Sequence, residues 1–134
     1  MAIEIKYTED GVGVELVASG TVFGEQILAA LEELQEKSVF QELKYKLINR
    51  LGCKKYFVST KDIRAIAEFD KAAVEMNPAL IIALVSPDNK VLQESAEIWH
   101  SFAKENVPRS KLFSDRASAD AWISVQLQND SDQR

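Results

Sequence analysis

Few side chains in this 134-residue chain could do chemistry. It contains one cysteine, Cys53, and one histidine, His100. A metal site built on His and Cys needs several such ligands at matched spacing, so we expect no metal site. We expect Lys54 and Lys55 to lower the thiol pKa of Cys53. No local signature pairs Cys53 with His100, which we interpret as a surface or boundary residue, and we therefore predict no catalytic residue and no cofactor.

The glycines and the acidic pairs give no sign of catalysis either. The five glycines are scattered, and neither of the standard phosphate-binding glycine spacings occurs. The adjacent acids Glu32 and Glu33 belong to a helical pattern on its polar side, where carboxylates are solvated. These patterns favour a binding or regulatory protein that is not an enzyme.

Residues 49–62 form the most suggestive segment. We expect a strand to end at Asn49 and a helix to begin at Ser59 and Thr60. A helix N-terminus presents free N–H groups and a positive dipole end, which favour an anion or a phosphorylated hydroxyl. Ligands of open α/β sheets lie beyond the carboxyl ends of the strands. Asn49, Ser59, Thr60 and Asp62 are therefore candidate phospho-acceptor or partner-binding residues; alternatively, Ser59 and Asp62 only form a capping box.

Composition and charge narrow the classes of protein further. The net charge of −5 argues against a nucleic-acid-binding module, which needs a basic surface. A lone cysteine favours a reducing compartment, and the N-terminus lacks the pattern of a secretory signal, so we predict a cytoplasmic protein. The longest apolar run, residues 79–85, is far shorter than the roughly 20 residues that cross a bilayer.

The hydrophobic periodicity of the first half predicts three strands and one helix. Residues 2–8 and 12–18 alternate around the turn signal Asp10-Gly11, which indicates an antiparallel hairpin at one edge of a sheet. Helical spacing starts near residue 22, with Thr21 as the expected N-cap. Residues 45–50 are a short strand candidate, although residues 40–47 could instead extend the helix, and residues 51–58 are expected to form a loop.

The second half alternates between helices and strands. A helix follows Ser59 and stops at Asn77-Pro78, and residues 79–85 are apolar on both faces, which is typical of a central strand. A helix over residues 90–104, a peripheral strand over residues 107–113 and a last helix complete the order β-β-α-β-α-β-α-β-α. We predict one α/β domain over residues 1–127, with a mixed sheet, and a frayed polar tail over residues 128–134.

Several stretches together resemble a known family. They are residues 18–25 (ASGTVFGE), 45–49 (YKLIN), 62–70 (DIRAIAEFD), 78–85 (PALIIALV), 112–115 (LFSD) and 119–122 (ADAW). In order and spacing they are similar to small bacterial proteins that resemble the anti-sigma-factor antagonists of sporulation, with a STAS-like fold. The resemblance covers most of the chain. It implies a sheet of four to five strands with helices mainly on one face.

The resemblance also implies a function. In the antagonists a partner kinase phosphorylates a serine at the start of the helix after the central strand, and Ser59 or Thr60 falls near that place. The chain departs from the family at residues 57–62 (FVSTKD), where the antagonists carry an Asp–hydrophobic–Ser segment, and at Asn49, where they commonly carry Asp. The expected function is a regulatory or protein-interaction module with a protein partner, and a homodimer is plausible for this family.

An alternative function is a carrier of a small apolar molecule or lipid. Some of the family's relatives are likened to lipid-transfer domains. Residues 51–58 contain apolar side chains, and the aromatic residues Phe23, Phe57 and Phe69 lie near expected helix starts or faces. This alternative requires an apolar cavity of about 300 Å³ or more.

Overall fold

A computed structural model describes residues 2–132 of the chain. Within these residues, the secondary structure comprises five strands, four α-helices and one short 3₁₀ helix, η1. In chain order these are β1 (Ile3–Tyr7), β2 (Gly13–Phe23), α1 (Gly24–Glu36), η1 (Ser38–Glu42), β3 (Tyr45–Phe57), α2 (Thr60–Met76), β4 (Ile81–Val85), α3 (Lys90–Ala103), β5 (Ser110–Phe113) and α4 (Arg116–Asp132).

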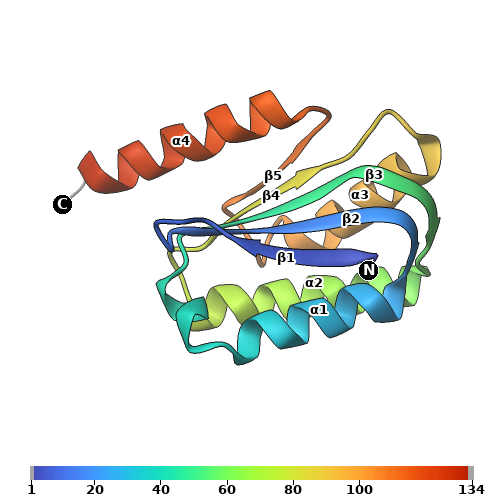
Figure 1. Cartoon of the computed structure of the whole chain (residues 1–134), viewed down its shortest axis with the longest axis horizontal. Coiled ribbons are helices and arrows are strands. Elements are labelled where there is room, and N and C mark those ends of the chain that lie inside the picture. Colours follow the sequence, from blue (N-terminus) through green and yellow to red (C-terminus); the bar gives the residue numbers. More distant parts are fainter. Residues whose placement is uncertain (1, 133–134) are drawn as a thin grey trace.

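The five strands form one mixed sheet in the order β1-β2-β3-β4-β5. β1 is antiparallel to β2, and the other three pairs are parallel. Helices α1, α2 and α3 lie on one face of the sheet, and α4 lies on the other (Figure 1). The predicted α/β class, the mixed sheet and the placement of helices mainly on one face are therefore confirmed.

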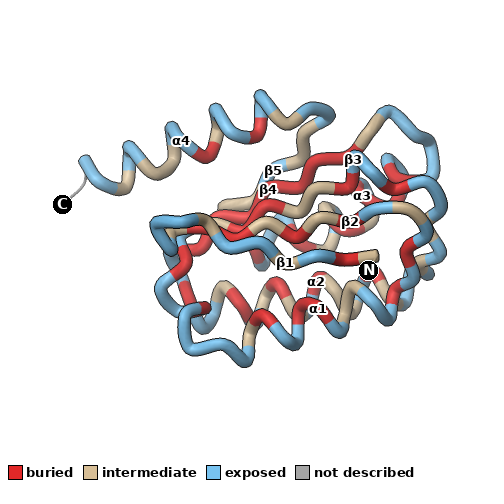
Figure 2. Tube along the Cα trace, viewed as in Figure 1, coloured by how far each residue is buried: buried red, intermediate tan, exposed pale blue. Residues whose placement is uncertain are grey.

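The core fills the two layers beside the sheet. All five residues of β4 are buried, as expected for a strand covered by helices on both faces (Figure 2). The larger layer packs the sheet against α1, α2 and α3. A smaller cluster beneath α4 contains Leu47, Ala83, Val85, Ala119 and Ile123. This cluster explains the apolar positions in the sequence of α4.

Strand β2 is longer than the sequence predicts. Gly20 does not end the strand; it adopts a φ of 66° next to a register shift, and the pairing with β3 then continues to Phe23. The predicted N-cap at Thr21 is therefore wrong, because Thr21 is still a strand residue. Phe23 occupies the N-cap position, and its backbone N–H donates to the side-chain oxygen of Gln26 at 2.8 Å.

The predicted loop over residues 51–58 is also wrong, because β3 runs on to Phe57. The two strands β2 and β3 extend together past the end of β4 and curl toward the starts of α1 and α2 (Figure 1). Cys53 and Tyr56 pack there against a core that includes Leu92 of α3. At the other end of the chain, α4 includes residues 128–132, where we expected a frayed tail; residues 133–134 lie outside the described residues.

A buried ion pair joins the sheet to two helices. The Nζ atom of Lys46 in β3 lies 2.5 Å from Oδ1 of Asp70 in α2, and the Lys46 side chain is only 1% exposed. The indole N–H of Trp99 in α3 donates to the other oxygen of Asp70 at 2.8 Å. Both oxygens of the carboxylate are therefore paired, as a charge in the interior requires.

We expect the substitution Asp70→Ala to lower the free energy of unfolding by about 3–5 kcal/mol, because it leaves the Lys46 ammonium buried without a partner. Urea titration followed by circular dichroism measures this. Glu68→Ala, which removes an exposed acid from the same helix, is the matched control and should change stability by less than about 0.5 kcal/mol. Equal losses in the two variants would show that the pair is not needed.

Candidate functional site

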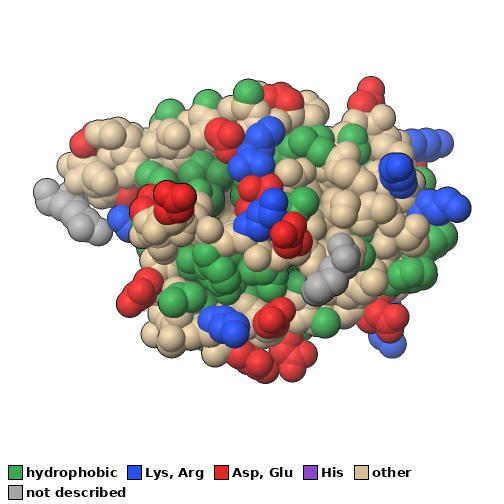
Figure 3. Space-filling view, in the orientation of Figure 1, with side chains coloured by type: hydrophobic (Ala, Val, Ile, Leu, Met, Phe, Trp, Pro, Cys, Tyr) green, Lys and Arg blue, Asp and Glu red, His purple; other side chains and the backbone are tan. Residues whose placement is uncertain are grey.

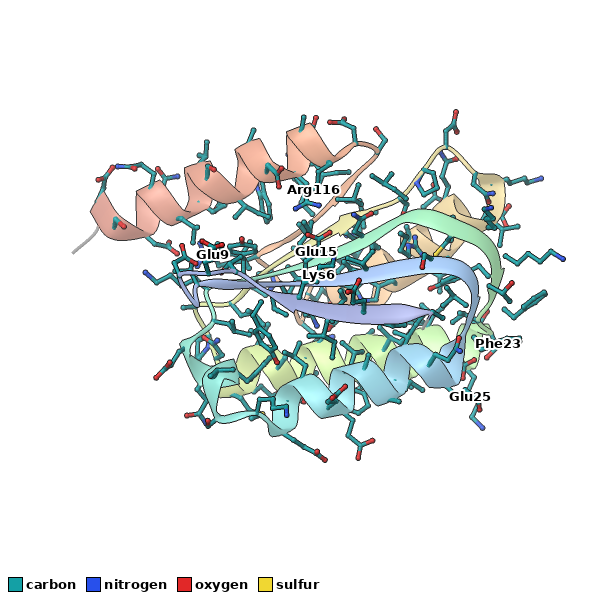
Figure 4. All side chains as sticks on the ribbon, in the orientation of Figure 1. Lys6, Glu9, Glu15, Phe23, Glu25 and Arg116 are labelled. Carbon is teal, nitrogen blue, oxygen red and sulfur yellow. The ribbon has the colours of Figure 1, made fainter. Side chains whose placement is uncertain are left out.

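The structure separates Asn49 from the other three candidate residues. Asn49 lies within β3, not at its end, and its side-chain N–H donates to Oε2 of Glu15 at 3.0 Å. Glu15 also pairs with Arg116 of α4 at 2.8 Å, and Figure 4 shows these two side chains pointing toward each other. Eight further residues of strand, roughly 26 Å along the chain, lead from Asn49 to Phe57. The expected grouping of Asn49 with Ser59 is therefore wrong.

Ser59 and Asp62 form the predicted capping box at the start of α2. The Ser59 hydroxyl accepts from the backbone N–H of Asp62 at 3.1 Å. The Asp62 carboxylate accepts from the backbone N–H of Ser59 at 3.2 Å. Ser59 and Thr60 are both exposed, so the cap leaves the two hydroxyls open to solvent. Capping and modification are thus compatible roles for Ser59.

The starts of α1 and α2 lie side by side. Gly24, the first residue of α1, is buried against the Asp62 side chain, and a Cβ at this position would collide with the carboxylate. Glycine is therefore required here by the close approach of the two helices. The Asp62 carboxylate lies near both N-terminal ends, where the helix dipoles favour a negative charge.

Two aromatic side chains project from this end of the molecule. Phe23 and Phe57 end β2 and β3 in register, and their rings stack with centroids 5.3 Å apart and an interplanar angle of 26°. Despite the stacking, Phe23 is 43% exposed and Phe57 is 55% exposed. Figure 4 shows Phe23 pointing away from the body of the protein.

Charged and hydroxyl side chains lie near the aromatic pair in the chain, including Glu25, which Figure 4 shows beside Phe23. Lys55 lies two residues before Phe57 on β3, and Lys61 lies in the first turn of α2; both are exposed. Figure 3 shows Lys or Arg side chains and hydrophobic side chains together at this end of the surface. We call this surface the phenylalanine end and define it by six residues: Phe23, Lys55, Phe57, Ser59, Thr60 and Lys61.

A cavity of about 60 Å³ lies between the sheet and helices α1, α2 and α3. Most of its lining is apolar, and its members with polar side-chain atoms are Lys46, Arg50, Tyr56, Asp70, Ser95 and Trp99. A water molecule in liquid occupies about 30 Å³, so the cavity has room for about two waters. It is far smaller than the roughly 300 Å³ that a carried ligand would need.

Arg50 is the polar group at one side of this cavity. It is 3% exposed, yet its hydrogen bonds go to neutral atoms: the Ser86 hydroxyl at 2.9 and 2.6 Å, the Ser95 hydroxyl at 3.1 Å and the Leu92 carbonyl at 2.8 Å. The guanidinium also lies 5.0 Å from the centroid of the Tyr56 ring. Arg50 thus links β3 to Ser86, the residue that follows β4, and to the first half of α3.

None of these buried polar groups was predicted, although one of them left a signal in the sequence. Asp70 follows Ile63 and Ile66 by seven and four residues, so it lies on the apolar stripe of α2 where an acid needs a buried partner. Lys46 and Arg50 left no comparable signal, because polar and apolar residues occur on both sides of β3.

Cys53 and His100 show no arrangement in which they could act together. Burial raises the pKa of the Cys53 thiol, and the nearby Arg50 only partly opposes this effect. The expected lowering by Lys54 and Lys55 is wrong, because both lysines are exposed while the thiol faces the core. His100 is half-buried, as expected of a boundary residue. Neither residue lines the cavity, and residues 2–132 contain no His/Cys/Asp/Glu group suited to a metal ion.

In comparisons with known proteins, no family model, no curated protein and no solved structure matches this chain. The STAS-like family assignment therefore stays a prediction. Within the described part of the chain, no helix is long and apolar enough to cross a membrane.

We expect Ser59→Ala to lower the free energy of unfolding by about 1 kcal/mol, because the Asp62 N–H loses its capping acceptor. Ser59→Asn keeps an uncharged acceptor at the N-cap and should lose less. Urea titration compares both with Thr60→Ala, which changes an exposed neighbour outside the box. If Ser59→Ala and Thr60→Ala were equally stable, the cap would contribute nothing.

Proposed function

We propose that this chain is a non-enzymatic protein-interaction module that binds its partner at the phenylalanine end. The observation that carries the proposal is the exposure of the stacked Phe23 and Phe57 rings. Large aromatic side chains are enriched at the centres of protein interfaces, where burying them provides much of the affinity. Two adjacent exposed rings offer such a centre before any partner is present.

Charge indicates the chemistry of the partner. The chain as a whole carries a net charge of −5, and near the aromatic pair the exposed Lys55 and Lys61 accompany one exposed acid, Glu25 of α1. A complementary partner surface presents apolar side chains to the rings and carboxylates to the two ammonium groups. The interaction would therefore weaken as the ionic strength rises.

Ser59 gives this surface a means of regulation. A phosphate on its hydroxyl adds nearly two negative charges beside the Asp62 carboxylate, which is hydrogen-bonded to the same residue. The repulsion weakens the hydrogen bonds of the capping box and adds negative charge to the surface that carries Lys55 and Lys61. Phosphorylation is therefore expected to release an acidic partner. The family resemblance of this serine supports the same role.

The observed interior favours this function over the carrier. The cavity between the sheet and helices α1, α2 and α3, about 60 Å³, is too small for a lipid or a comparable ligand. The larger groove between β1 and α1, about 610 Å³, is lined by charged as well as apolar side chains, among them Glu4, Glu33 and Lys37. Of residues 51–58, which motivated the carrier, residues 51–57 belong to β3 and do not form a loop around a pocket. The high thiol pKa of the buried Cys53 likewise supports a non-enzymatic role.

We expect Phe23→Ser and Phe57→Ser to abolish capture of the partner. The immobilised chain is exposed to lysate of its native host, captured proteins are identified, and each is purified and titrated by calorimetry. For a protein that binds at the phenylalanine end, each of these two substitutions should raise the Kd by about 30-fold or more. Val125→Ser is the matched control, because Val125 is 54% exposed on α4, away from this surface. A partner bound equally by all three variants would refute the proposed surface.

We further expect Ser59→Glu to weaken the partner's binding by about tenfold, because it places a negative charge beside Asp62. Ser59→Gln adds a side chain of the same size at the same position without the charge, so its Kd should lie well below that of Ser59→Glu. Mass spectrometry of the chain isolated from its host tests the modification itself. Phosphate-free Ser59 under all growth conditions, with an unchanged Kd for Ser59→Glu, would exclude the regulatory role.

A further inference from the structure

We propose that the outer edge of β1 pairs with the same strand of a second copy of this chain, so that two five-stranded sheets join across a two-fold axis at Ile5. The interface is distinct from the phenylalanine end. This inference goes beyond the proposed function and does not depend on it.

The backbone of β1 presents an open edge. β1 is the first strand in the sheet order, so only β2 pairs with it within the described residues. The Ser19 N–H donates to the carbonyl of Ala2 at 2.9 Å, and the Thr8 N–H donates to the carbonyl of Gly13 at 3.0 Å. Because antiparallel ladders alternate, the even-numbered residues face β2 and the odd-numbered residues direct their N–H and C=O groups outward.

Pairing about a two-fold axis at Ile5 would give these outward N–H and C=O groups hydrogen-bond partners. Antiparallel pairing about that point sets Ile5 opposite Ile5 of the second copy, and Ile3 opposite Tyr7. These are the three residues whose backbone groups point away from β2. Three hydrogen-bonded pairs with two bonds each would form about six new hydrogen bonds.

Charge selects the same register. Glu4 and Lys6 lie on one face of β1, with Nζ 3.6 Å from Oε2, and both are exposed. About an axis at Ile5, each Glu4 lies opposite Lys6 of the other copy, in the non-hydrogen-bonded positions where side chains come closest. An axis at Glu4 would oppose two carboxylates, and an axis at Lys6 would oppose two ammonium groups. The sequence IEIKY is thus self-complementary in one antiparallel register.

The other face of β1 offers apolar surface to the same partner. A groove of about 610 Å³ runs between β1 and α1, with Ile5, Tyr7, Ala29 and Ala30 in its lining and Glu33 and Lys37 at the α1 side. Tyr7 is 42% exposed in the single chain. Figure 3 shows hydrophobic side chains along the face where β1 lies above α1. In the dimer, each Tyr7 would pack beside Ile3 of the other copy and bury this surface.

The first test is the mass of the full chain in solution. The chain weighs 15.0 kDa, so sedimentation at about 100 µM should report twice that mass. Ile5→Pro removes an outward N–H without removing a β1–β2 hydrogen bond, so it should shift the mass to that of a monomer. Hydrogen exchange should show protection of the Ile5 amide that increases with protein concentration.

Charge variants keep the test decisive if the proline variant fails to fold. Each of the single variants Glu4→Lys and Lys6→Glu places side chains of like charge opposite each other at both positions related by the two-fold axis. Each should therefore raise the dimer Kd about tenfold or more. The double variant Glu4→Lys with Lys6→Glu exchanges the signs and should restore the Kd to within about threefold. A 15.0 kDa species at 100 µM, or a dimer that these variants do not weaken and restore, would overturn the proposal.

Discussion

Lys46 and Asp70 bring two opposite charges into the space between the sheet and the helices. Each charge alone would be costly there, because the interior solvates an ion poorly. Together with the Trp99 indole they connect β3, α2 and α3 through one carboxylate. This requirement for complete pairing ties the positions of both helices to the central strand. The positions of the surfaces on α2 and α3 therefore also depend on this pairing.

Arg50 extends the same constraint along β3. Its guanidinium is held by Ser86, Ser95 and the Leu92 carbonyl, so the strand cannot leave the core where β4 ends. β2 follows β3 by parallel pairing, and both strands reach the helix starts. The exposed phenylalanine pair is a direct consequence, since in-register strand ends place Phe23 and Phe57 next to each other. A shorter β3 would have left neither ring in position.

The two proposed contacts use different parts of this scaffold and different physical terms. The phenylalanine end combines exposed aromatic area with two ammonium groups, which suits a foreign partner of opposite charge. The β1 edge combines unpaired backbone groups with a self-complementary charge pattern, which suits a second copy of the same strand. A dimer of this kind would carry two phenylalanine ends.

Local signals in the sequence were sufficient for the element order, the edge hairpin, the buried strand β4 and the Ser59–Asp62 cap. Each of these depends on alternation, an apolar run or a short-range hydrogen bond, all of which are written in neighbouring residues. Only the tertiary structure decided that Gly20 bends a strand instead of ending it, and that residues 51–57 pair with β2. The tertiary structure also places Asn49 far along β3 from Ser59, and it places Lys46 beside Asp70. Strand pairing and the burial of charge depend on partners distant in the chain, which no local pattern specifies.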